Sequence, residues 1–297
     1  MMKNGLPLLA ICVLILVATG IGLFYHPDVP PIRTESLRGQ SATFVAAGPY
    51  RYNPVFFARE GAVWDAVNLF LALPLLVLSA LFALRDNLRG RLLLGGMLAY
   101  FWYVYLGTAL MNAFNDLFLV YVGIVALCAV AFVQNAARID VDRVRAACAD
   151  RFPRRILIGY SLGIAAVLVG LWTSRVAAVM RTGMFPPEYA GINTLGSQAL
   201  DLGLLVPLAL STAVLLGKRS PWGYYLASIT VSMGFMMSVT IPCWIVVPLV
   251  QDGQARMGEA VPFFVVSLVG ITVAVLYLSR LRPASRARTA AAMPVGR

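Results

Sequence analysis

Histidine and paired cysteines are scarce in this sequence. His26 is the only histidine, and none of the four cysteines forms a C-x-x-C pair; they are Cys12, Cys128, Cys148 and Cys243. A bis-histidine haem or a multi-histidine zinc site needs more histidines than this, and a thiol oxidoreductase typically uses a close cysteine pair. Walker A and dinucleotide-binding motifs are also lacking. We therefore expect no cofactor and no metal site.

Charged residues are equally few, at 12% of the chain, whereas hydrophobic residues make up 60%. A soluble domain carries roughly 25% charged residues, so this chain has too few to cover a water-exposed surface. An α-helix needs about 20 apolar residues to cross a bilayer. Eight stretches predict such helices: residues 6–24, 62–84, 92–113, 117–134, 156–172, 194–217, 222–241 and 260–278. The expected fold is an all-α integral membrane protein.

The first stretch has two interpretations. Lys3, an apolar run and the small residues 18–20 are also features of a cleavable secretory signal. The apolar run is long for the core of a signal peptide, so we interpret residues 6–24 as an uncleaved membrane anchor.

Basic residues outnumber acidic ones, 24 to 13, and the excess lies on one side of the eight-helix topology. That side takes 17 of the Lys and Arg residues and 4 of the acids, and the other side takes 7 and 9. The positive-inside rule then places both termini in the cytoplasm. The pattern predicts a prokaryotic inner-membrane protein whose basic side faces anionic inner-leaflet lipids, with no nucleic-acid partner.

A weak internal repeat divides the chain. Pro74 lies 16 residues before Gly90, and Pro207 lies 16 residues before Gly223, with a basic turn before each glycine. An even number of helices separates the copies, which predicts two parallel four-helix halves. The expected organisation is a first half (1–137, with outer loop 26–61), a cytoplasmic basic linker (138–155), a second half (156–280) and a disordered basic tail (281–297).

The outer loop between the first two helices has strand character. Residues 40–47 are followed by the turn signal Gly48-Pro49 and then by alternating aromatics in 50–57. We expect a small hairpin over the outer mouth of the bundle. An interfacial aromatic belt explains the same residues without a hairpin.

Residues 35–135 resemble a known family. The motifs are GPYRYN at 48–53, WDAVNL at 64–69, LPLL at 73–76, LRGRLL at 88–93 and NDLFLVYV at 115–122. They are similar to an uncharacterised family of prokaryotic multi-pass membrane proteins that has no established activity. The resemblance implies a shared fold and places Tyr50, Asp65, Tyr100, Tyr103 and Asn115 among the residues of the family pattern.

Polar residues inside the predicted helices are the candidate site. A carboxylate near a helix N-terminus often serves only as a cap, which is the structural interpretation of Asp65. Asp201 lies about two turns into its helix, where an ionisable group indicates function. The predicted ligand-binding residues, drawn from both halves, are Asp65, Asn68, Tyr100, Tyr103, Asn115 and Asp201.

Three functional classes are compatible with these features. The first is a transporter or ligand-binding protein for a small molecule, with an outward-facing polar and aromatic cavity. The second is a membrane-embedded enzyme acting on a lipid-linked substrate, although no catalytic constellation is visible. The third is an accessory or sensor subunit of a membrane complex. A homo-oligomer or a membrane partner is compatible with each class.

Overall fold

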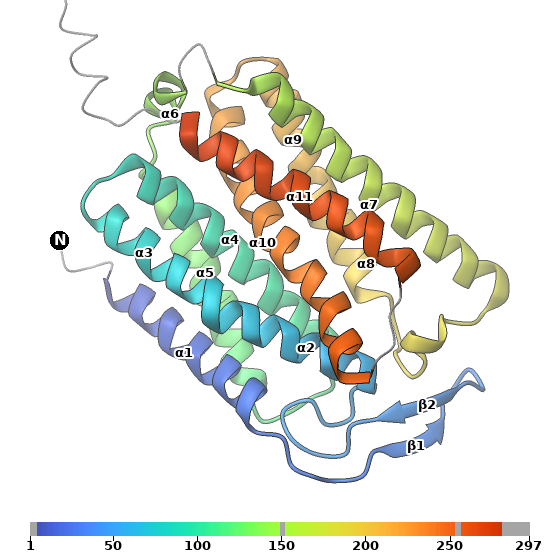
Figure 1. Cartoon of the computed structure of the whole chain (residues 1–297). Coiled ribbons are helices and arrows are strands. Elements are labelled where there is room, and N and C mark those ends of the chain that lie inside the picture. Colours follow the sequence, from blue (N-terminus) through green and yellow to red (C-terminus); the bar gives the residue numbers. More distant parts are fainter. Residues whose placement is uncertain (1–4, 149–151, 253–256, 281–297) are drawn as a thin grey trace, which may run out of the picture.

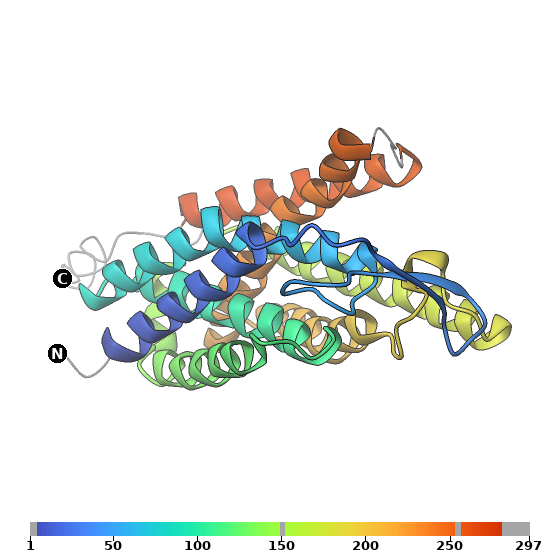
Figure 2. The same cartoon turned by 90° about the horizontal axis from the view of Figure 1, so that it is seen from below.

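The computed structural model describes residues 5–148, 152–252 and 257–280. Its helices and strands are α1 (Gly5–Phe24), β1 (Ile32–Glu35), β2 (Ser41–Phe44), α2 (Val55–Val67), α3 (Leu73–Leu84), α4 (Leu88–Met111), α5 (Phe118–Ala136), α6 (Val141–Ala147), α7 (Arg154–Thr182), α8 (Gly196–Leu200), α9 (Val206–Gly217), α10 (Pro221–Asp252) and α11 (Met257–Arg280). The long helices run side by side, with β1 and β2 at one end and α6 at the other (Figure 1). We call these the hairpin end and the basic end. The start of α1 and the end of α11 lie toward the basic end (Figures 1 and 2).

Seven helices of the described chain are long and apolar enough to cross a membrane. They are Gly5–Phe24, Val55–Leu84, Leu88–Met111, Phe118–Ala136, Arg154–Thr182, Gly196–Gly217 and Pro221–Trp244. The eighth predicted stretch, residues 260–278, falls within α11, whose described apolar part, Phe264–Arg280, is shorter than a span. The helical, apolar character agrees with the expected multi-pass membrane fold.

The hairpin at the outer loop differs from the predicted one. β1 pairs antiparallel with β2, with Ile32 opposite Phe44, and the turn between them contains Gly39 at a φ of 75°. Gly48-Pro49 does form a turn, and an antiparallel bridge between Phe44 and Pro54 joins the chain on its two sides, but α2 begins directly afterwards at Val55. The predicted strand at 50–57 is therefore limited to this single bridge. Pro54 has no N–H for a strand ladder, and it stands directly before the helix start.

Two spans contain a π-helical segment, and each segment leads into a proline. Residues Asn68–Ala72 connect α2 to α3, and Asp201–Leu205 connect α8 to α9. Pro74 and Pro207 follow at the second residue of the next helix. A proline removes one helix hydrogen bond and displaces the carbonyl four residues earlier, which a π-helical turn accommodates.

The same correspondence continues at the basic end. Asp86 and Arg219, the residues that turn the chain after α3 and α9, have positive φ values of 57° and 54°. Gly90 and Gly223 then approach the preceding helix so closely that an added Cβ would lie 2.5 Å from it in both cases. Each pair is separated by 133 residues in the chain, as are the two prolines. The two segments share their local geometry position by position.

α4 and α10 pack closely at the centre of the bundle. A Cβ added to Gly96 of α4 would lie 2.3 Å from the Ser232 Oγ on α10, so only glycine permits this approach. Small residues bring membrane helices together in this way and maximise dispersion contacts between their backbones. α4 is the most enclosed of the seven spans, which places its polar side chains in the interior.

Two regions outside the predicted spans are also helical. α7 extends to Thr182, ten residues beyond the predicted end at 172. Within the expected linker 138–155, Asp140 accepts hydrogen bonds from the backbone N–H groups of Asp142 and Arg143 and caps α6. Val144 of α6 is fully buried. The predicted tail 281–297 lies outside the described residues.

Candidate functional site

Asp201 is the centre of a buried polar cluster. It lies at the start of the second π-helical segment, five residues after the beginning of α8, which corresponds to about 7.5 Å of helix. Its Oδ1 accepts a hydrogen bond from the Tyr103 hydroxyl of α4. Its Oδ2 accepts one from the Trp172 Nε1 of α7 at 2.7 Å. Both donors are uncharged, so the carboxylate, which is 8% exposed, is solvated by neutral dipoles from two other spans.

Gln198 lies one helical turn before Asp201 and is 2% exposed. Neither its Nε2 nor its Oε1 has a hydrogen-bond partner among the described residues. An amide buried in this way loses its bonds to water, at a cost of about 1–3 kcal/mol for each unsatisfied group. Residues three apart share a face of a helix, so the carboxylate and the amide lie on the same side of α8.

Asn68 occupies the matching position at the start of the first π-helical segment. Its Oδ1 accepts a hydrogen bond from the Tyr100 hydroxyl at 2.8 Å, and both side chains are almost fully buried. Trp64 lies beside Tyr100, with ring centroids 6.3 Å apart, and contacts Trp244 of α10 edge to face. Asn68 and Asp201 therefore bind tyrosines that are one turn apart on the same helix, α4.

Asp65 forms a third, separate contact. Its Oδ2 accepts a hydrogen bond from the hydroxyl of Tyr50, which reaches in from the outer loop. Burial and the neighbouring carboxylate raise the pKa of Tyr50 well above its ordinary value. Asp65 stands ten residues inside α2, about 15 Å from the helix start, so the expected role as a first-turn cap is wrong. The helix begins earlier than predicted because the Pro54 turn, and not the apolar run, sets its start.

Asn115 forms hydrogen bonds within the loop before α5 and lies beside Tyr121, which is close to Asp65. Its Oδ1 accepts a hydrogen bond from the Leu117 backbone N–H at 2.9 Å, and its Nδ2 donates to the Ala113 carbonyl. The nearby Asp116 is exposed and forms an ion pair with Arg51 at 3.1 Å. Of the six predicted site residues, Asn68, Tyr100, Tyr103 and Asp201 thus meet along α4, Asp65 pairs with Tyr50, and Asn115 bonds its own loop.

The outer hairpin is fastened to the loop that follows α7. The Gln40 amide exchanges two hydrogen bonds with the backbone of Phe185, and Arg38 donates to the Gly183 carbonyl. Beneath this contact Tyr189 accepts a hydrogen bond from Arg175 of α7 at 2.8 Å. Two segments that are far apart in the sequence therefore form one cover at the hairpin end of the bundle.

One sequence pattern associated with serine hydrolases occurs but lacks its structural context. Gly159, Ser161 and Gly163 match G-x-S-x-G, yet all three lie inside α7. A nucleophile elbow is a sharp strand-to-helix turn that exposes its serine, whereas Ser161 is 1% exposed on a helix. Within the described ranges, no group of three or more His, Cys, Asp and Glu side chains is arranged to hold a metal ion.

The structure adds Trp172 and Gln198 to the predicted site. Trp172 is the last residue of the predicted span 156–172, and Gln198 lies within the predicted span 194–217. The spacing of Gln198 and Asp201 was a usable signal, since polar residues three apart share one helix face. The hydrogen bond between Tyr103 and Asp201 joins residues that are 98 positions apart, so no local sequence pattern could predict it.

No family model matches the chain, and no curated protein and no solved structure is found to be similar to it. The resemblance of residues 35–135 to a family of prokaryotic membrane proteins stays a prediction.

Proposed function

We propose that this multi-pass membrane protein binds and transports a small polar molecule at the cluster of Asp201, Gln198, Tyr103 and Trp172. The observation that carries the proposal is Gln198, a buried amide with neither atom hydrogen-bonded by the described chain, one turn from a buried carboxylate. Such groups are costly inside an apolar bundle, and ionisable residues at such positions commonly mark a ligand pathway. The amide offers a donor and an acceptor, and the carboxylate offers acceptors, so the ligand must itself both donate and accept hydrogen bonds.

The π-helical segments provide a structural basis for movement. Asp201 and Asn68 begin the two segments, and each segment is followed by a proline. Interrupted helices in matching positions of two repeats commonly carry the binding site of a transporter. The shared geometry of the two segments and their basic turns supports an internal duplication into two parallel four-helix halves. In this arrangement the first half supplies Tyr103, and the second supplies Asp201 and Trp172.

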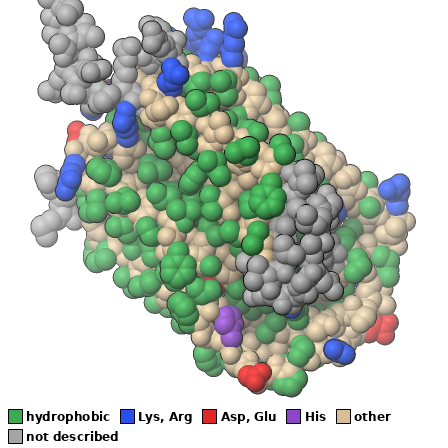
Figure 3. Space-filling model, viewed as in Figure 1, with side chains coloured by type: hydrophobic (Ala, Val, Ile, Leu, Met, Phe, Trp, Pro, Cys, Tyr) green, Lys and Arg blue, Asp and Glu red, His purple; other side chains and the backbone are tan. Residues whose placement is uncertain are grey.

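The charge distribution supports one orientation. Basic side chains gather toward the basic end, and the wide middle of the surface is predominantly apolar (Figure 3). By the positive-inside rule the basic end faces the cytoplasm, so both termini are cytoplasmic and the hairpin faces outward. Asp201 then lies close to the outer side, beneath the cover formed by the hairpin and the loop after α7. Access from outside requires movement of that cover.

The proposal is tested by identifying what the purified protein binds. Small molecules that co-purify with the wild type are identified by mass spectrometry, and their uptake into proteoliposomes is measured. Asp201→Asn removes the charge at similar volume, and Asp116→Asn is the matched control, because Asp116 is exposed and its carboxylate is paired with Arg51. Loss of a hydrogen bond to a charged group costs about 1.5–3 kcal/mol, so we expect Asp201→Asn to lower affinity roughly 10- to 100-fold.

Two outcomes contradict the proposal. Equal retention of the compound by wild type and a folded Asp201→Asn variant removes Asp201 from the binding site. Conversion of the compound to a product, without net uptake, favours the alternative of a membrane-embedded enzyme. Elution profile and melting temperature establish that each variant is folded.

A further inference from the structure

A separate cavity opens at the basic end of the bundle, far from Asp201 in the fold. It encloses about 290 Å³ between α1, α3, α4 and α5. Its lining residues are Pro7, Leu8, Ala80, Ala83, Leu84, Arg91, Leu94, Leu98, Ala131, Gln134, Asn135 and Arg138. The volume is at the lower end of the range for small-molecule sites. The transport proposal does not involve this cavity, and the motif LRGRLL at 88–93 reaches it through Arg91.

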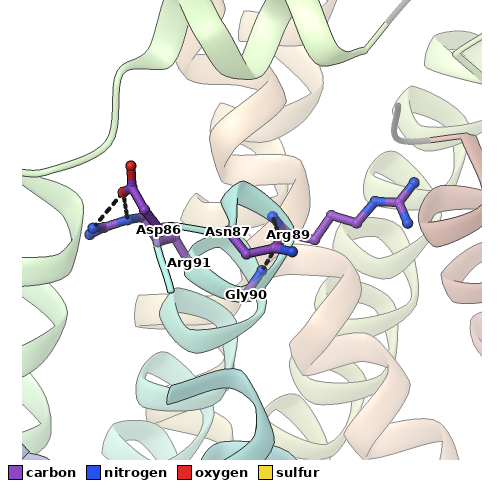
Figure 4. Close-up of polar contacts among 5 residues, drawn as sticks. All are labelled: Asp86, Asn87, Arg89, Gly90 and Arg91. Atoms are coloured by element: carbon purple, nitrogen blue, oxygen red, sulfur yellow. Dashed lines mark hydrogen bonds and ion pairs between the residues drawn. The ribbon is translucent and has the colours of Figure 1, made fainter. Parts of the chain in front are cut away.

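The rim of the cavity is polar and basic. Arg91 and Arg138 contribute the guanidinium groups, beside the amides of Gln134 and Asn135. Arg91 forms an ion pair with Asp86 at 2.9 Å, and Asn135 donates to the Arg91 carbonyl at 3.0 Å, which fixes this side of the rim. Figure 4 shows Arg91 directed at Asp86, and Arg89 extending away from both. The residues that line the cavity include two arginines and no acidic side chain.

The interior of the cavity is apolar. Along α4 the lining runs from Arg91 to Leu98, and it continues from Ala131 to Asn135 of α5 and to Arg138 just after that helix. Seven residues of α4 span about 10 Å, so the hollow extends that far from the charged rim toward the bundle centre. The cavity exists because its walls on α3 and α5 carry small side chains, namely Ala80, Ala83 and Ala131.

We infer that this cavity is a binding site for an anionic phospholipid, with the phosphate at Arg91 and Arg138 and part of an acyl chain in the apolar interior. Basic pockets between membrane helices bind acidic headgroups by charge, and each arginine near the membrane surface contributes about a fivefold gain in affinity. A soluble anion uses the rim alone and leaves the apolar depth unfilled. A cavity with arginines at its rim and an apolar interior matches both parts of a phospholipid. It therefore favours the phospholipid over a soluble anion.

The test uses the full chain, purified and equilibrated with mixed vesicles of phosphatidylglycerol and phosphatidylcholine in equal parts. Native mass spectrometry then measures the lipids that remain bound. The variants are Arg138→Gln at the rim and Ala131→Leu in the wall, which fills the hollow. Arg85→Gln is the matched control, because it removes one positive charge from the same turn region but does not line the cavity.

We expect phosphatidylglycerol to be retained in preference to phosphatidylcholine by wild type and by Arg85→Gln. Arg138→Gln lowers this retention about fivefold, and Ala131→Leu lowers it without any change of charge. Equal retention by Arg138→Gln and Arg85→Gln overturns the proposal, as does equal retention of the two lipids. Displacement of the bound lipid by inorganic phosphate alone, with no effect of Ala131→Leu, also overturns it in favour of a soluble-anion site.

Discussion

Gly22 of α1 packs directly against the side chain of Asp65, so substitution of Gly22 by alanine has a clear expected effect on stability. A Cβ at this residue would lie 1.9 Å from the Oδ2 and 2.7 Å from the Cγ of Asp65. That oxygen is also the acceptor for Tyr50. The Gly22→Ala substitution must therefore displace the carboxylate and break the contact that anchors the outer loop to α2.

Three contributions determine how much Gly22→Ala changes the free energy of unfolding. Overpacking in a closed interior costs about 1–3 kcal/mol, and loss of a hydrogen bond to a charged group costs about 1.5–3 kcal/mol. Alanine in place of glycine returns about 1 kcal/mol of helix propensity. The expected net destabilisation is about 1.5–5 kcal/mol, and at about 2–4 °C per kcal/mol the melting temperature falls by at least about 3 °C.

The same helix offers a matched control for this experiment. Gly20 has no atom within 4 Å of an added Cβ, so Gly20→Ala is expected to be neutral or mildly stabilising. Melting temperatures are measured for both variants in detergent and again in an Asp65→Ala background, where the clash is absent. There, Gly22→Ala should behave like Gly20→Ala. If the Gly22→Ala cost persists without Asp65, or is no larger than that of Gly20→Ala, the reasoning is refuted.

Further predictions concern the repeated turns and the buried thiol. Gly90→Ala and Gly223→Ala each place a Cβ 2.5 Å from the preceding helix, so both should lower stability by a similar amount, about 1–3 kcal/mol. Gly217→Ala, with no atom within 4 Å, should leave the melting temperature unchanged, and clearly unequal costs at the two turns contradict their equivalence. Burial raises the pKa of the Cys148 thiol to about 12, so at pH 7.5 the nucleophilic thiolate is nearly absent. In a variant with the other three cysteines replaced by alanine, maleimide should label Cys148 only after unfolding in SDS, and rapid labelling of the folded protein counts against its burial.

The spans were predictable because membrane insertion depends on local composition. Residues 92–113 and 117–134 differ from α4 and α5 by no more than four residues at either end. The lengths of α2 and α7 were underestimated, because both helices extend beyond their apolar cores toward the hairpin end. The pairing of β2 with β1 was missed for a different reason, since a four-residue strand has too few side chains to indicate its partner.

The candidate site was predictable as a set of residues but not as an arrangement. Tyr100 binds Asn68, and both belong to the predicted set. Tyr103 binds Asp201, which sequence reasoning did not connect with it. In a soluble protein the hydrophobic periodicity would show which helix face is inside. In a membrane helix the lipid-facing side is also apolar, so that signal is weak.

The sequence by itself determined that the chain is helical and membrane-like, where its spans lie and which residues carry charge. These properties follow from the transfer of each segment into hydrocarbon, which depends on local composition. Only the tertiary structure decided that Asp201 is held by Tyr103 and Trp172, that Asp65 pairs with Tyr50, and that a cavity opens beside Arg91 and Arg138. These contacts depend on how each helix is rotated about its axis, and that rotation is set by close packing at glycines such as Gly22 and Gly96.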